Sequence, residues 1–126
     1  MDELELERCS NGFALRVIRV GVGLPKTKVS DVLGDPLLKA GTSVGAHDRA
    51  ANRAESRADF IHKISLGEKE ASDSQSWLER FEEIGHGGMT ERRALLKGSG
   101  ELLAIFTAIG KSPKANNAKS EIGHPK

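Results

Sequence analysis

The chain has 126 residues and a mass of 13.6 kDa, which is enough for one domain and too little for two. Nineteen Lys and Arg against eighteen Asp and Glu give a formal charge of +1, and this excludes a protein with a dominant basic surface for nucleic acid. Leu, Ile, Val and Phe together number 30 of 126, so the core is thin, and we expect a second copy of the chain to support it.

The cysteine count and the N-terminal residues narrow the class of protein further. Cys9 is the single cysteine, which favours a reducing compartment, and we interpret it as a small, partly buried side chain rather than a reactive thiol. Residues 1–8 are acidic, unlike the basic start of a signal peptide. No apolar run approaches the roughly 18 residues of a membrane span, so we expect a soluble cytoplasmic protein without a membrane partner.

Apolar residues recur at helical spacing near the start of the chain. Phe13, Val17, Val20 and Leu24 follow one another at steps of four, three and four, which places them on one face of a helix. Pro25 ends this predicted helix, because the residue before a proline is disfavoured in the α region.

Two signals compete for the start of the second helix. Ser30-Asp31 is one candidate N-cap, and Asp35-Pro36 is another, with Pro at the first helical position. We predict a helical turn near residues 28–34 and then a long helix over about 35–54. Two glycines four residues apart would let another helix approach its inward face closely. The predicted inward residues are Leu37, Ala40, Gly41, Val44 and Gly45.

The third helix has the clearest start, because Ser56 and Asp59 have the spacing of a capping box. The glycine-rich segment 85–88 ends it. Small residues at its centre favour tight packing against a neighbour. Its predicted inward stripe is Phe60, Ile64, Gly67, Ala71, Ser74, Leu78 and Phe81.

Thr90-Glu91 is predicted to cap a fourth helix, and its inward seam consists of Leu95, Leu102, Phe106 and Ile109. After this seam the composition changes to Lys, Asn, Ser, Pro and Gly, which is typical of a disordered segment. The sequence therefore predicts an all-α protein, an antiparallel up-and-down four-helix bundle over residues 1–110. Residues 111–126 are predicted to form a disordered basic C-terminal tail.

Seven sequence blocks resemble, in order and in spacing, successive blocks of one protein family. They are FALRVI (13–18), LPKT (24–27), LLKAGTSVGA (37–46), SRADFI (56–61), KEA (69–71), WLE (77–79) and ELLAIF (101–106). The family is the four helix bundle protein family, also called the 23S rRNA-intervening-sequence protein family. The resemblance covers roughly residues 12–110.

What the resemblance implies is mainly architectural. Family members are antiparallel four-helix bundles that assemble into ring-shaped homopentamers, and some are encoded within insertions in bacterial large-subunit ribosomal RNA genes. The accessory protein of diversity-generating retroelements is a relative, a basic pentamer that binds nucleic acid and a reverse transcriptase. Most members have no assigned biochemical activity. This chain departs from the family pattern at His47 and Ala50, where relatives usually carry Asn and Glu.

Charge is segregated along the chain. Residues 16–69 contain ten basic and six acidic residues, whereas residues 70–110 contain four basic and seven acidic ones. The basic segment could hold an RNA backbone in a salt-sensitive way, without the aromatic platforms that stack bases. The alternative is a solvated helix face, or salt bridges between subunits to Asp48, Glu55 and Asp59. The candidate nucleic-acid-binding residues are Arg16, Arg19, Lys26, Lys28, Arg49, Arg53, Arg57 and Lys63.

Catalytic and metal-binding patterns are weak. Asp59/His62 and Glu83/His86 imitate the carboxylate-x-x-His spacing of di-metal bundles, but they lie 24 residues apart on one predicted helix, about 36 Å. The glycine pair within 41–45 lacks the Gly-Lys-Ser/Thr ending of a phosphate loop. We predict no catalytic residues, no metal, no cofactor and no small-molecule substrate.

Together these observations predict a non-enzymatic homo-oligomeric scaffold, a pentamer, that contacts structured RNA or an RNA-associated protein through a basic face. The second hypothesis is a protein-interaction adaptor with no role in nucleic-acid binding.

Overall fold

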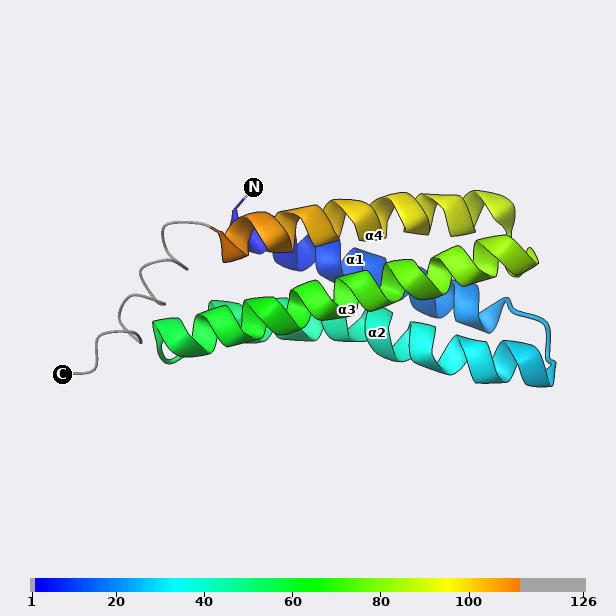
Figure 1. Ribbon diagram of the computed structural model, residues 1–126, viewed down its shortest axis with the longest axis horizontal. Helices are drawn as coiled ribbons and strands as arrows, with labels where there is room; N and C mark the ends of the chain where they lie inside the picture. The colour runs from blue at the N-terminus through cyan, green and yellow to red at the C-terminus, as the bar shows by residue number, and fades with distance from the viewer. Residues whose placement is uncertain (1, 112–126) are drawn as a thin grey trace.

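A computed structural model describes residues 2–111, whose regular secondary structure consists of four long helices lying side by side (Figure 1). The helices are α1 (Glu3–Val22), α2 (Lys28–Asn52), α3 (Arg57–Ile84) and α4 (Met89–Gly110). Each helix packs against the next one along the chain, and α1 also contacts α4, though much more sparsely. The predicted all-α, up-and-down four-helix architecture is therefore confirmed, with the start of α1 and the end of α4 at the same end.

Helix α1 begins ten residues before the first apolar residue of its predicted stripe. Asp2 caps it, because its carboxylate accepts a hydrogen bond of 2.8 Å from the Glu5 backbone N–H. Leu6 and Ser10 are buried and extend the inward stripe toward the N-terminus. The acidic start of the chain is thus a helical first turn, where the helix dipole favours carboxylates.

Helix α2 differs from the prediction, because one continuous helix replaces the expected turn and separate helix. The Thr27 hydroxyl caps it by accepting from the Ser30 N–H at 3.1 Å, and Pro36 lies inside it. Pro36 has no N–H to donate to the Val32 carbonyl, which would weaken a buried helix. Val32 is exposed, so water can satisfy that carbonyl and the helix continues.

Helix α3 confirms the prediction most closely, since its buried residues are the seven of the predicted stripe. The Ser56 hydroxyl accepts from the Asp59 N–H at 3.0 Å, as expected of a capping box. The Asp59 carboxylate reaches back to the Glu55 N–H rather than to that of Ser56. Gly85 ends the helix in the left-handed region at φ 69°, which glycine adopts without steric cost.

Helix α4 begins earlier than predicted, and its cap is different. Gly88 is its N-cap and no side chain caps it, so the prediction that Thr90 and Glu91 cap the helix is wrong. Its inward seam includes Leu95, Leu102 and Phe106, all buried as expected. The two glycines at 98 and 100 leave the helix continuous.

Close approach between helices depends on glycine at two positions. A Cβ on Gly41 would lie 2.9 Å from the Val17 side chain, and a Cβ on Gly67 would lie 2.8 Å from the Phe106 ring. Both contacts are too short for any other residue without rearrangement. The small-residue segments of α2 and α3 are therefore the places where α1 and α4 pack closest, as their spacing predicted.

Two further predictions concern the chain ends and surface. The predicted tail at residues 111–126 lies outside the described residues, apart from Lys111 directly after α4. Cys9 is exposed rather than partly buried. None of the four helices combines the length and apolarity needed to cross a bilayer.

Candidate functional site

The eight predicted basic residues do not form one site, because the antiparallel helices divide them between the two ends of the bundle. Lys28 and Arg49 begin and end the basic stretch of α2 and are 21 residues apart, about 32 Å along the helix. One group lies toward the α1–α2 connection and consists of Arg16, Arg19, Lys26 and Lys28. The other lies toward the α2–α3 connection and consists of Arg49, Arg53, Arg57 and Lys63.

Some of these basic side chains form ion pairs within the chain. Lys63 pairs with Asp59 at 4.0 Å, one turn earlier on α3. Arg53 pairs with Glu7 of α1 at 3.5 Å, a long contact in which the Arg53 side chain is 62% exposed. Exposed pairs of this kind contribute about 0–1 kcal/mol, so they leave these cations available to other anions.

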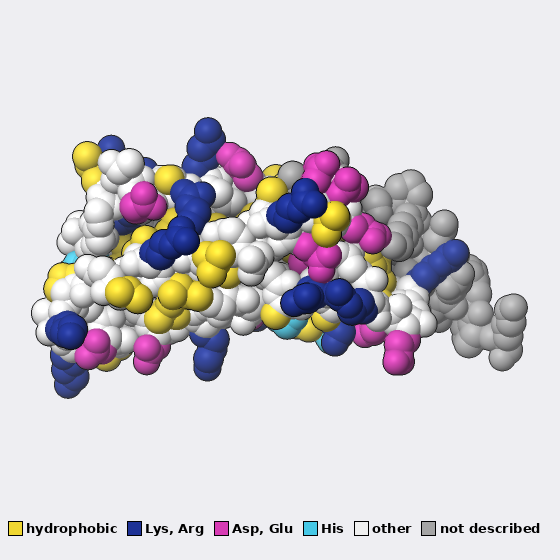
Figure 2. All heavy atoms as spheres, turned by 180° about the vertical axis from the view of Figure 1, so that it is seen from behind, with side chains coloured by type: hydrophobic (Ala, Val, Ile, Leu, Met, Phe, Trp, Pro, Cys, Tyr) yellow, Lys and Arg dark blue, Asp and Glu magenta, His cyan; other side chains and the backbone are white. Residues whose placement is uncertain are grey.

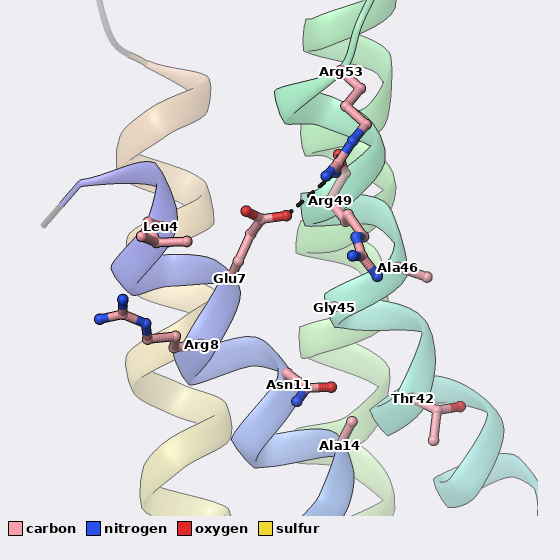
Figure 3. A pocket seen from close by; sticks show the side chains of 10 residues that line it. All are labelled: Leu4, Glu7, Arg8, Asn11, Ala14, Thr42, Gly45, Ala46, Arg49 and Arg53. Carbon is pink, nitrogen blue, oxygen red and sulfur yellow. Dashed lines mark hydrogen bonds and ion pairs between the residues drawn. The ribbon is translucent and has the colours of Figure 1, made fainter.

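A groove between α1 and α2 lies beside Arg49 and Arg53 of the second basic group (Figure 3). It has a volume of about 470 Å³, and small residues, Ala14 and Gly45, lie where the two helices meet at its base, while Ala46 lies on the outer side of α2 (Figure 3). Arg49 and Arg53 come from the α2 wall, whereas Arg8, which the sequence did not single out, comes from α1. We refer to this feature as the α1–α2 groove.

A buried acid lies on the inward side of α2, close to this groove. Asp48 is 1% exposed, and burial raises its pKa to about 6, with further contributions from the charges of Glu7 and Glu3. Its Oδ2 atom has no hydrogen-bond partner, and the same holds for the buried Ser10 Oγ and Asn52 Nδ2 atoms. The sequence contained a signal for this residue, because Asp48 continues the inward spacing four residues after Val44.

A second buried charge fixes the turn between α3 and α4. The Arg92 side chain is 7% exposed and donates to Glu82 at 2.6 Å and to the carbonyls of His86 and Gly87 at 3.0 Å each. The hydrogen bond from Arg92, joined by that from Arg93, holds the pKa of Glu82 below its usual range. No sequence signal indicated this role, since two adjacent arginines at a helix start look like solvated side chains.

Apolar side chains also lie on the outside of the bundle. Leu15, Ile18 and Val22 follow one another at steps of three and four on α1, and they are 45%, 40% and 82% exposed. Val29 and Val32 of α2 are exposed near the same end. On the face shown in Figure 2, apolar and basic side chains lie next to each other over the end where α1 terminates, while acidic and basic side chains mix near the other end.

The patterns that imitate catalytic or metal sites are kept apart by the fold. Asp59 and His62 lie in the first turns of α3, whereas Glu83 lies in its last turn. Within residues 2–111, no three His, Cys, Asp or Glu side chains are grouped as metal ligands would be. Trp77 is half-buried on α3, with the guanidinium of Arg80 4.5 Å from its ring centre.

Among solved structures, the chain is similar in both fold and sequence to a protein of the same size class. A solved structure from Bacteroides thetaiotaomicron, a protein with unknown function from the S23 ribosomal protein family, is 29% identical to this chain, with a TM-score of 0.81. The match covers 89% of this chain and all of the other. No protein-family model and no curated protein matches the chain. The likeness in both fold and sequence confirms the resemblance to the 23S rRNA-intervening-sequence family.

Proposed function

We propose that this chain, a homologue of a protein of unknown function from the S23 ribosomal protein family, is a non-enzymatic homo-oligomeric scaffold that contacts structured RNA. Five copies form a ring, and the basic residues of each copy bind the RNA backbone. The observation that carries the proposal is the exposed apolar stripe Leu15, Ile18 and Val22 on α1.

This stripe faces away from the core of its own bundle. Phe13 and Val17 of the same helix are 4% and 0% exposed, so α1 presents apolar side chains on two opposite sides. A helix with two apolar faces is stable in water when both faces are covered. Because Leu15, Ile18 and Val22 are exposed, a neighbouring copy can pack on this stripe, and it would supply the core that the composition lacks.

The oligomer is tested by light scattering, which should give a mass of about five times 13.6 kDa. Ile18→Glu places a charge in the proposed interface, so it should yield a 13.6 kDa protomer that keeps its helical circular dichroism. Ser72→Glu, at an exposed polar position on α3, serves as the control and should leave the mass unchanged. A wild-type mass of one protomer would refute the ring.

The RNA contact is tested separately, by binding of a labelled RNA hairpin at 50 to 200 mM salt. Backbone-directed binding should weaken steeply over this range, because each phosphate contact releases counterions. If wild-type protein binds no RNA at 50 mM salt, and instead copurifies with one protein through nuclease and high salt, then the adaptor hypothesis replaces the RNA contact.

A further inference from the structure

The α1–α2 groove combines an open floor with charged walls. A Cβ on Gly45 would lie 3.5 Å from the Ser10 backbone, so α1 and α2 are in contact beneath the groove, and no long side chain fills it. Of the ten lining residues, three are arginines and one, Glu7, is acidic. In Figure 3 the Arg8 side chain extends away from α2, so the charged groups that lie between the two helices are Arg49, Arg53 and Glu7, with a net charge of +1.

The polar groups of the groove have spare hydrogen-bonding capacity. Arg49 extends over Gly45, and Asn11 projects toward it from the opposite wall (Figure 3). Within the described residues, neither side chain has a hydrogen bond or ion pair of its own. The Arg53 guanidinium donates long hydrogen bonds to the Glu7 carboxylate, at 3.5 Å, and to the Arg49 carbonyl, at 3.3 Å. An acceptor with better geometry can replace either partner.

We infer that the α1–α2 groove binds a phosphate of the RNA backbone, held by the guanidinium groups of Arg49 and Arg53, with the Asn11 amide donating from the other wall. The inference rests on the proposed function, and it assigns the contact to one of the two basic groups. Planar guanidinium groups bind phosphate oxygens with two parallel hydrogen bonds, which a floor of small residues leaves room for.

The lining also indicates which part of the RNA is bound. None of the ten lining residues is aromatic, so the groove offers no surface on which a base could stack. Its donors suit phosphate oxygens rather than the edges of bases. We therefore expect binding to depend on backbone charge and little on base sequence.

The test compares variants with the same loss of charge inside and outside the groove. Arg49→Gln with Arg53→Gln should weaken binding of a fluorescein-labelled RNA hairpin about tenfold at 100 mM KCl. The slope of log affinity against log salt should become less negative by roughly 1 to 2. The matched control, Lys39→Gln with Lys97→Gln, removes the same charge at exposed positions outside the eight candidate residues and should change affinity by no more than about twofold.

A second variant tests the groove without changing charge. Asn11→Leu removes the amide donor of the α1 wall, and it should reduce hairpin affinity while circular dichroism and light-scattering mass stay unchanged. Inorganic phosphate at 5 mM, compared with KCl at matched ionic strength, should not displace the hairpin. Displacement by phosphate would instead make the groove a site for the free anion and overturn the RNA assignment.

The possible failures can be told apart. Equal losses of affinity in the two double variants, with Asn11→Leu unaffected, would overturn the assignment of the phosphate to the groove and leave the RNA contact of the proposed function intact. An absence of RNA binding by the wild-type protein at 50 mM salt would overturn both.

Discussion

Two buried charged side chains, Asp48 and Arg92, differ in how well the surrounding protein satisfies them. Arg92 makes its hydrogen bonds to Glu82 and to two backbone carbonyls, so its burial holds the α3–α4 turn together. Asp48 is equally buried but has an unpartnered oxygen and two glutamates nearby. A buried charge in that setting destabilises the folded state, and protonation relieves the penalty.

The stability of this protein should therefore depend on the protonation of Asp48. Its folded-state pKa of about 6 lies above the ordinary value of 3.8, so its favourable contribution is complete below about pH 4 and is lost as the pH rises through 6. Asp48→Asn removes the charge and should raise the free energy of unfolding at pH 8 by up to about 3 kcal/mol. It should also flatten the fall in stability between pH 4 and 8.

Urea unfolding at pH 4.5 and pH 8 measures this effect. The control is Asp35→Asn, which alters an exposed carboxylate on the same helix and should preserve the wild-type dependence on pH. If Asp48→Asn loses as much stability as the wild type between the two pH values, then Asp48 does not titrate in this range.

At the scale of the helices, sequence spacing predicted the buried faces better than the helix ends. The stripe of α3 was predicted completely because seven residues repeat at steps of four and three without interruption. The predicted start of α2 was wrong because local signals at Asp35-Pro36 resemble a helix start, whereas Val32 is exposed, so water can satisfy its carbonyl and the helix continues through Pro36. The predicted start of α4 was wrong because the helix begins after Gly88 without a capping side chain, so the sequence carries no capping signal at that position.

Replacing a helical glycine with alanine should raise or lower the stability of the protein, depending on which atoms surround the glycine. Gly67→Ala would place a Cβ 2.8 Å from the fully buried Phe106 ring and should destabilise the protein by about 1–3 kcal/mol. Gly12→Ala meets no atom within 4 Å on α1 and should stabilise it by about 0.5–1 kcal/mol through helix propensity. Thermal unfolding of the two variants distinguishes packing from propensity, and a shift of the same sign in both would contradict the explanation.

At the scale of the whole molecule, the four helices are unequally supported. Helix α3 packs between α2 and α4, whereas α1 is held mainly by α2 and exposes an apolar stripe. Segments with fewer buried contacts open more readily. In the proposed ring, helix α1 is thus the element that would depend most on a neighbouring copy.

Hydrogen exchange measures this dependence directly. In the Ile18→Glu protomer, amides of α1 should exchange faster than those in the centre of α3, because the sparse α1–α4 contact leaves α1 the easiest helix to release. In the wild-type oligomer the α1 amides should be protected by the neighbouring copy. Equal exchange of α1 in the two proteins would show that no neighbour covers it.

The sequence by itself determined the number of helices, most of their inward faces and the glycines at the close crossings, because helical periodicity is a local property of the chain. It also contained the family resemblance. Only the tertiary structure decided which charges meet, since the antiparallel packing of α1 on α2 brings Arg53 next to Glu7 from 46 residues away. The groove and the glutamates near Asp48 depend on the same packing of two helices, and no local pattern specifies them.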